Sequence, residues 1–254
     1  MKTDRPVQHM LSELGFAVTR VGTDFEGTAS IVPDMCVPGT DHLRTSLLAT
    51  WADHLSGLLA VTVMAPQVPV TLGLEVHLFT PAPGSGAVRC VGTSLKTGRS
   101  VFMASVEFST AAGEPVAVST GSFMTAPDRS LRLPSTFSLD GPQPELRLQV
   151  PWAQRAGCER REPGVAELPR SDDGLNSSNT LNGGLIALVT EEAALSLSPG
   201  ATLSSLSLRY LRPIRVGPAV ASAQARSGLG QIEVRDAGND NRLSVLATAR
   251  YFDR

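Results

Sequence analysis

The feature that most restricts the fold of this chain is a segment, residues 185–197, that has helical length and is apolar on nearly every face. A helix of this kind buries all its sides, so the rest of the chain must surround it. Asn182 stands just before it and is a favourable N-cap, because its side chain can accept a hydrogen bond from a free N–H of the first turn. One acid, Glu191, falls on the apolar surface, where a carboxylate is either costly or functional.

A pair of glycines, Gly183 and Gly184, opens this helix, and an Asn-rich loop that begins at Asn176 leads into it. Glycines allow another molecule to approach the backbone closely, and the N–H groups at a helix start attract negative charge. This stretch therefore combines a candidate anion-binding site with a buried acid.

The same order of elements occurs earlier in the chain. Residues 45–64 are apolar and free of breakers, which favours a helix, and alternating segments typical of strands follow both helices. A short helix is expected at 7–14 and a strand–turn–strand at 16–33, and a loop-rich lead-in precedes the second helix. The strands expected after the two helices are 72–78, 87–95, 101–110 and 116–124, then 206–210, 219–226, 231–236 and 243–252.

These parallels indicate an internal repeat. Residues 45–49 match residues 183–187, and the strand end 78–82 matches 210–214. In that register Asp53 of the first helix corresponds to Glu191 of the second.

Each repeat would be one buried helix with about four antiparallel strands, an α+β architecture in which a curved sheet wraps around its helix. We expect repeats at residues 1–126 and 146–254, joined by a linker at 127–145 that is rich in Pro, Ser and Asp. A single mixed α/β domain with accidental similarity is the alternative.

Composition narrows the classes of partner. The 254 residues carry a formal charge of −2, and without a basic run they offer no footprint for nucleic acid or a membrane surface. No apolar run is judged long enough to span a bilayer, and no signal core follows the N-terminus. The cysteines, Cys36, Cys90 and Cys158, have neither metal-ligand nor disulfide spacing, so a reducing, cytoplasmic location is expected.

At this point the chain resembles the hotdog fold in its tandem, double-hotdog form. Acyl-CoA thioesterases similar to the phenylacetate-pathway enzyme carry an Asn, a short loop, His-Gly-Gly, apolar residues and then an acid. Asn176, Asn182, the pair Gly183-Gly184 and Glu191 match that motif in order, and the strand that ends at Arg212-Pro213 also resembles the family.

Several positions depart from the family pattern. Asn182 replaces the His, and the position four residues after the acid, where some relatives carry Thr, is Leu195 in one repeat and Gly57 in the other. The first repeat is more eroded still. It has Pro38, Arg44, Thr45 and Ser46 where the leading Asn, the His and the two glycines would stand.

The resemblance implies that the helix start of one repeat lies beside the acid of the other. Thioester hydrolysis develops negative charge on the carbonyl oxygen, which the N–H groups of Gly183 and Gly184 could hold, each donor lowering the barrier by about 3–4 kcal/mol. Glu191 is the first candidate for general base or nucleophile, since apolar neighbours raise a carboxylate pKa, and Asn176 could orient the water.

The pseudo-equivalent site would use Asp53 as its acid, with Thr45 and Ser46 offering the backbone donors of the other helix start. The sequence leaves open which acid pairs with which helix start.

The activity expected from the resemblance is hydrolysis of acyl-CoA or another acyl thioester. No cofactor or metal is expected, since coenzyme A enters as part of the substrate, and a homodimer of double hotdogs is the expected assembly. A hotdog hydratase or dehydratase acting on enoyl thioesters, and a module that binds acyl thioesters without cleaving them, are the alternatives.

Overall fold

A computed structural model describes residues 9–133 and 147–252 of the chain. Most of the predicted linker, residues 134–145, lies outside the described residues, so the expected repeat boundaries stay a prediction. The described part of it, residues 127–133, runs beside the start of a strand, where Leu133 N–H donates to the carbonyl of Pro66.

Both repeats contain one long helix and six strands. The first repeat comprises η1 (Met10–Leu14), β1 (Phe16–Val21), β2 (Asp24–Ser30), η2 (Pro33–Met35), α1 (Thr45–Met64), β3 (Pro69–Leu78), β4 (Ala87–Thr97), β5 (Phe102–Thr110) and β6 (Pro115–Thr125). The second comprises α2 (Trp152–Arg155), β7 (Glu159–Glu162), β8 (Val165–Leu168), η3 (Asp172–Gly174), α3 (Gly183–Ser196), β9 (Leu203–Tyr210), β10 (Ala219–Arg226), β11 (Leu229–Asp236) and β12 (Arg242–Tyr251).

The strands form one antiparallel sheet in the order β1-β2-β4-β5-β6-β3-β9-β12-β11-β10-β8-β7. Read outward from the central pair β3 and β9, the two halves have the same connectivity, which is the arrangement that a duplicated unit produces. The sequence missed the hairpin β7–β8, because β7 reads Glu-Arg-Arg-Glu and is exposed throughout. Such a charged strand at a sheet edge discourages pairing with other chains.

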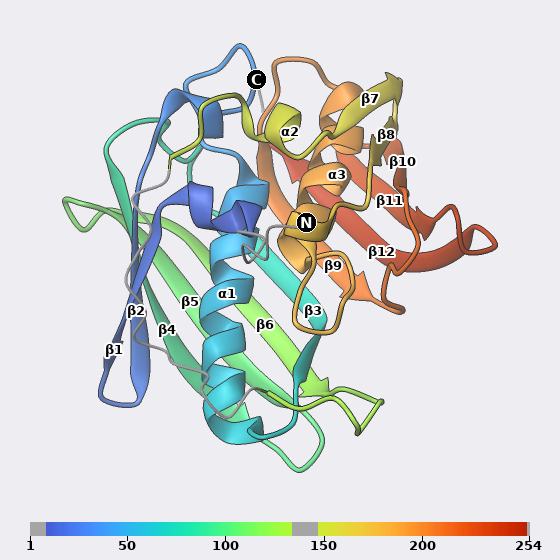
Figure 1. The fold of residues 1–254 in the computed structure, drawn as a ribbon. Helices are drawn as coiled ribbons and strands as arrows, with labels where there is room; N and C mark the ends of the chain where they lie inside the picture. The colour runs from blue at the N-terminus through green and yellow to red at the C-terminus, as the bar shows by residue number, and fades with distance from the viewer. Residues whose placement is uncertain (1–8, 134–146, 253–254) are drawn as a thin grey trace, which may run out of the picture.

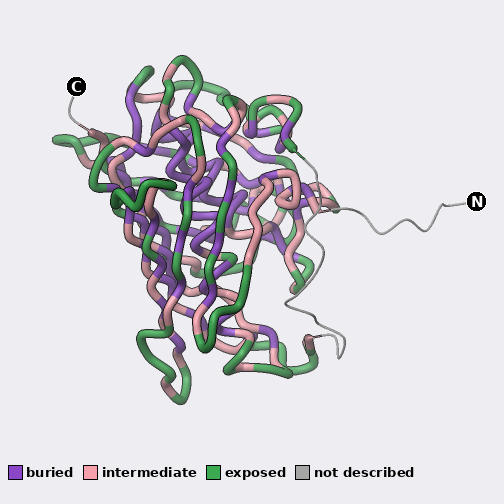
Figure 2. The backbone as a smooth tube through the Cα atoms, turned by 90° about the vertical axis from the view of Figure 1, so that its left-hand side faces the viewer, coloured by how far each residue is buried: buried purple, intermediate pink, exposed green. Residues whose placement is uncertain are grey.

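Both long helices pack side by side on the same face of the sheet (Figure 1). Alternate residues of the central strands point towards them, as in β5, where Phe102, Ala104, Val106 and Phe108 are buried. Figure 2 shows buried residues running through the interior, with exposed residues in the connecting loops. The sheet thus wraps around its helices, and the molecule is a double hotdog of the α+β class.

Matching hydrogen bonds in the two halves confirm the repeat and its register. The N–H of Leu43 donates to the carbonyl of Ala82, and the N–H of Leu181 donates to that of Ile214. One residue further on, Arg44 and Asn182 donate to η2 and η3 in the same way. Arg44 therefore corresponds to Asn182.

One expectation from the sequence needs correction. The sequence predicts no apolar run long enough to span a bilayer, but α1, with 20 residues, is long and apolar enough to cross one by length and composition. More than half of the apolar stretch is buried inside the protein, and the core helix of a folded domain meets the same criteria.

Candidate active site

The two helix acids lie at corresponding places, each beside the start of the opposite helix. Asp53 of α1 reaches the start of α3, where a Cβ atom added to Gly183 would lie only 2.9 Å from Asp53 Oδ2. Glu191 of α3 reaches the start of α1, where its Oε1 accepts the N–H of Ser46 at 3.2 Å. The protein therefore has two pseudo-equivalent candidate sites.

The Asp53 carboxylate is half-buried and held by one side chain. Thr71 Oγ1 of β3 donates to Asp53 Oδ1 at 2.8 Å. A β-bulge between Thr71 and Gly73 interrupts the alternation of β3, and such a bulge redirects the side chains beside it. Burial raises the pKa of Asp53 to about 6, while the hydrogen bond from Thr71 opposes the rise.

The glycine pair is required by close packing at the start of α3. A Cβ atom at Gly184 would lie 2.4 Å from Thr50 Oγ1 of α1, so the two helices meet too closely there for any side chain. Asn182 caps the helix as predicted, and its Oδ1 accepts the N–H of Gly184 at 2.8 Å. The N–H of Gly183 lies in the first turn, where backbone donors have no partner within the helix.

A tyrosine that the sequence analysis did not single out completes this group. Tyr210, at the end of β9, donates its hydroxyl to the carbonyl of Gly183 at 3.1 Å. Burial and then the charge of Asp53 raise the pKa of Tyr210 well above its usual value, so the phenol stays protonated.

Asn176 has a local role in the loop that leads to α3. Its Oδ1 accepts the N–H of Ser178 at 2.9 Å, the N–H of Thr180 at 3.2 Å and the hydroxyl of Thr180 at 3.1 Å. Three donors of its own loop thus occupy the oxygen, and the side chain organises the approach to the helix start.

The second site is closed by an arginine. Arg44, which corresponds to Asn182, is fully buried, and its NH1 lies 3.2 Å from Glu191 Oε2 and 2.6 Å from Glu192 Oε1. Arg160 Nε lies 2.6 Å from the other oxygen of Glu192. Burial disfavours the charge on Arg44, but Glu191 and Glu192 outweigh it and raise the arginine pKa.

The start of α1 offers its donors to the protein itself. Ser46 gives its N–H and, at 2.6 Å, its hydroxyl to Glu191, and Thr45 Oγ1 donates to the carbonyl of Leu203 at 3.0 Å. Glu191 is 0 % exposed. The structure therefore fills this site with an ion-pair cluster, which we call the Arg44 cluster: Arg44, Ser46, Arg160, Glu191 and Glu192.

The charges of the two sites differ accordingly. Within residues 9–133 and 147–252, Asp53 forms no ion pair. Its carboxylate accepts from Thr71, and the neighbouring Tyr210 hydroxyl and Gly183 backbone are uncharged. Glu191 faces the Arg44 guanidinium, and both of its carboxylate oxygens have partners. Asp53 is the more exposed acid, and no ion pair closes its site, which we call the open site.

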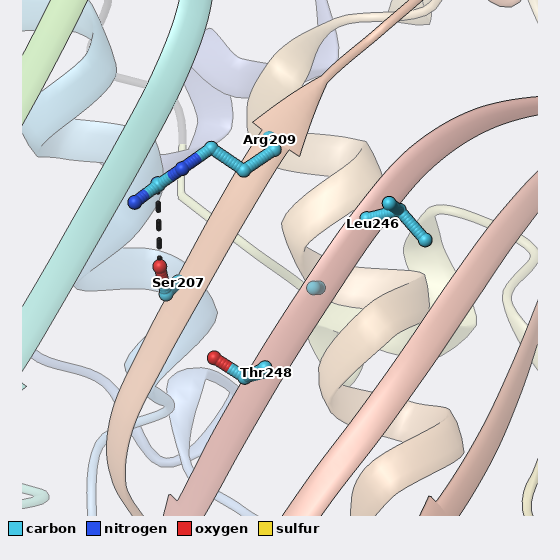
Figure 3. A pocket seen from close by; sticks show the side chains of 5 residues that line it. Ser207, Arg209, Leu246 and Thr248 are labelled. Carbon is cyan, nitrogen blue, oxygen red and sulfur yellow. Dashed lines mark hydrogen bonds between the residues drawn. The ribbon is translucent and has the colours of Figure 1, made fainter.

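A shallow hollow on the molecule belongs to neither site. It is lined by Ser207 and Arg209 of β9 and residues 246–248 of β12 (Figure 3). Leu246 is 42 % exposed, and in this view α3 lies behind the strands. The hollow is thus on the outer face of the sheet, away from the helices.

The loop that follows Tyr210 is fastened to the sheet by a buried acid. Asp236 is 0 % exposed and accepts the N–H groups of Arg215, Val216 and Gly217 at 2.9, 3.2 and 2.6 Å. These bonds fix the loop whose Ile214 carbonyl accepts the N–H of Leu181, just before α3.

Comparison with known proteins connects this geometry to a superfamily. Residues 42–117 match the family model of the thioesterase superfamily, and this segment contains Asp53 and Thr71. No curated protein sequence matches the chain.

Solved structures share the fold over nearly the whole chain. The 12:0-ACP thioesterase from Umbellularia californica is 14% identical with a TM-score of 0.67, covering 93% of this chain and 100% of that one. An acyl-ACP thioesterase from Bacteroides thetaiotaomicron is 13% identical with a TM-score of 0.63, covering 91% and 98%. A TesB protein from Mycobacterium avium subspecies paratuberculosis is 15% identical with a TM-score of 0.61, covering 96% and 98%.

These structures establish the double-hotdog fold, and the match over residues 42–117 supports acyl thioester hydrolysis at the level of the superfamily.

Proposed function

We propose that this double hotdog, whose first repeat matches the thioesterase superfamily, hydrolyses acyl-CoA thioesters at the centre formed by Asp53 and Gly183. The observation that carries the proposal is the approach of the Asp53 carboxylate to the start of α3, within 2.9 Å of where a Gly183 side chain would begin. A carboxylate beside a helix start, where backbone N–H groups have no intrahelical partner, supplies the base and the oxyanion donor that acyl transfer needs.

The chemistry follows from the two groups. Attack on the thioester carbonyl places negative charge on its oxygen, which the Gly183 N–H and the positive end of the α3 dipole stabilise. Asp53 Oδ2 takes a proton from a water molecule while the water oxygen bonds to the carbonyl carbon. The C–S bond then breaks, the acid is released, and the thiolate takes up the proton.

The carboxylate can also attack the carbonyl carbon directly. The C–S bond then breaks, the thiolate leaves and takes up a proton from solvent, and water opens the anhydride that has formed. Single-turnover hydrolysis in ¹⁸O-water separates the courses, because only the anhydride course can place ¹⁸O in the protein carboxylate. Either course needs an ionised Asp53, and a pKa of about 6 leaves it ionised yet basic near neutral pH.

Thr71 supports this role by holding Oδ1 at 2.8 Å, which leaves Oδ2 directed at Gly183. Of the two amides considered from the sequence, Gly184 is committed to Asn182, so the oxyanion donor in this proposal is Gly183.

We assign Glu191 a structural role. Its two oxygens accept from Ser46 and pair with Arg44, so neither is available to a substrate. Asp53 and Glu191 thus divide into one catalytic and one structural acid, and the proposal is a single centre per chain.

A matched pair of variants tests the assignment. Hydrolysis of a panel from acetyl-CoA to palmitoyl-CoA, with benzoyl-CoA and phenylacetyl-CoA, is followed by release of thiol. Asp53→Asn is expected to lower kcat by about 10²–10⁴-fold, the usual range for a general base. Glu191→Gln should keep kcat within a few-fold at a temperature where thermal unfolding shows both variants to be folded.

Absence of turnover on every substrate, or full activity in Asp53→Asn, would refute the proposal. Loss of activity in Glu191→Gln alone would move the centre to the other helix. Tight binding of acyl-CoA without hydrolysis would favour a binding module, and hydration of crotonyl-CoA would favour a hydratase.

The carrier and the assembly are part of the same proposal. Two of the similar structures are described as acyl-ACP thioesterases, so the panel is repeated with acyl chains on acyl carrier protein. A homodimer predicts a mass in solution of twice 26.7 kDa, measured by light scattering.

A further inference from the structure

The peptide group between Gly183 and Gly184 is clamped at both ends. Its carbonyl oxygen accepts the hydroxyl of Tyr210 at 3.1 Å, and its N–H donates to Asn182 Oδ1 at 2.8 Å. The two clamps come from different parts of the chain, one from the end of β9 and the other from the cap of α3. Such fixation matters here, because glycine has the freest backbone of any residue.

The clamp by Tyr210 lies inside the site. A Cβ atom on Gly183 would lie 3.2 Å from the Tyr210 hydroxyl and 2.9 Å from Asp53 Oδ2. The phenol and the carboxylate therefore approach Gly183 from the same side. Rotation of the peptide that follows Gly183 would change the backbone conformation of Gly183 at the point where the helix start meets the carboxylate.

The clamp is specific to the open site. In the register fixed by Ala82 and Ile214, Tyr210 corresponds to Leu78 of β3, which has no hydroxyl. At the closed site the helix start is instead held by Glu191 through Ser46. The hydroxyl therefore occurs only where the helix start is left open.

We propose that Tyr210 is a positioning residue for the reaction, which holds the Gly183 amide in the direction needed to stabilise the oxyanion. This inference rests on the proposed function. Tyr210 acts through the backbone of Gly183, so its loss should lower the rate of the chemical step and leave ground-state binding unchanged.

The chain offers a matched control in its second tyrosine. Tyr251 donates its hydroxyl to the carbonyl of Ala194 at 2.9 Å, near the opposite end of α3. Tyr210→Phe and Tyr251→Phe thus each remove one tyrosine–carbonyl hydrogen bond from the same helix. A general loss of helix packing would affect both variants alike.

The test measures kcat, KM and the melting temperature of both variants with the acyl-CoA that wild type hydrolyses fastest. We expect Tyr210→Phe to lower kcat about tenfold, less than the 10²–10³-fold lost when an oxyanion donor itself is removed. KM and binding of the matching non-hydrolysable thioether of CoA should stay within twofold. Tyr251→Phe should leave kcat unchanged, and both melting temperatures should fall by similar amounts.

Asp53→Asn in the same assay distinguishes a failure of the proposed function from a failure of the positioning role of Tyr210. If Asp53→Asn is inactive while Tyr210→Phe and Tyr251→Phe have the same kcat, the role of Tyr210 is overturned and the proposed function stands. A rise in KM and weaker thioether binding with unchanged kcat overturn it as well. No hydrolysis by wild type, or full activity in Asp53→Asn, overturns both.

Discussion

Replacement of Arg44 by methionine removes the guanidinium that faces two buried carboxylates, while it leaves a long apolar side chain in its place. Glu192 keeps its ion pair with Arg160, but Glu191 is left with the two donors of Ser46. Glu191 must then stay ionised without a cation or take up a proton. The cost of protonating Glu191 is the upper limit of the destabilisation. For an ordinary Glu pKa of about 4.3, protonation at pH 7 costs about 3.7 kcal/mol, at about 1.4 kcal/mol per pH unit.

We therefore expect Arg44→Met to lower the free energy of unfolding by about 3–4 kcal/mol at pH 7, as is usual when one partner of a buried ion pair is removed. Burial already raises the pKa of Glu191, and Arg44 opposes the rise. Without Arg44 the folded-state pKa lies further above its unfolded value, so the folded variant binds more protons and loses more stability as the pH rises. At pH 5 protonation costs only about 1 kcal/mol. The destabilisation should shrink by about 3 kcal/mol between the two conditions.

Urea unfolding at pH 5, 6 and 7, with wild type at each pH as reference, measures this difference. Arg161→Met is the control, because Arg161 pairs with Glu159 and Glu167 on the exposed β7–β8 hairpin, where such pairs contribute at most about 1 kcal/mol. The double variant Arg44→Met, Glu191→Gln should recover much of the loss. A destabilisation of Arg44→Met that is independent of pH, or no larger than that of the control, would refute the reasoning.

Three further predictions concern acids. The kcat/KM is expected to fall tenfold per pH unit below a pKa near 6, because Asp53 acts only when ionised; a flat profile down to pH 4.5 in folded protein would contradict this. Thr71→Val removes the hydrogen bond that lowers the pKa of Asp53, so the fall of kcat/KM in acid should begin at higher pH. Thr71→Ser should return the profile to that of wild type, and an unchanged profile in Thr71→Val would show that Thr71 does not control this pKa. Asp236→Asn should cost about 2 kcal/mol at pH 7, since charged acceptors form the stronger hydrogen bonds. Burial raises the pKa of Asp236, but its backbone donors together outweigh burial and lower the folded-state pKa. Its stabilisation is therefore present above an unfolded pKa of about 3.9 and disappears as the pH falls, so thermal unfolding at pH 3 and 7 should show the variant approaching wild type in acid.

The sequence predicted the duplicated architecture because its signals are local and strong. An apolar helix, a glycine pair and a strand ending at proline recur in the same order, and the hydrogen bonds of Leu43 and Leu181 confirm the register. The hairpin β7–β8 was missed, since its first strand is charged at every position and owes its place to pairing with β8.

The site was only partly predictable for a related reason. The sequence indicates Asp53, the Gly183-Gly184 start and Glu191, and we propose Asp53 as the catalytic acid although apolar helical neighbours favour Glu191. Its true environment depends on Arg44, which stands 147 positions away in the chain and reads as one more charged residue in a loop. Thr71 and Tyr210 lie on strands. A bulge beside Thr71 and the approach of β9 to the start of α3, neither visible in a pattern of residues, direct them to the proposed site.

The joining of both repeats in one polypeptide, with β3 and β9 side by side at the centre of the sheet, has an evolutionary consequence. In an assembly of two identical subunits, any substitution at a helix start appears twice and alters both active centres together. A tandem chain can change one start alone. Under the proposed assignment, a position like that of Arg44 is free to drift towards a stabilising role while its counterpart Asn182 continues to serve the proposed chemistry.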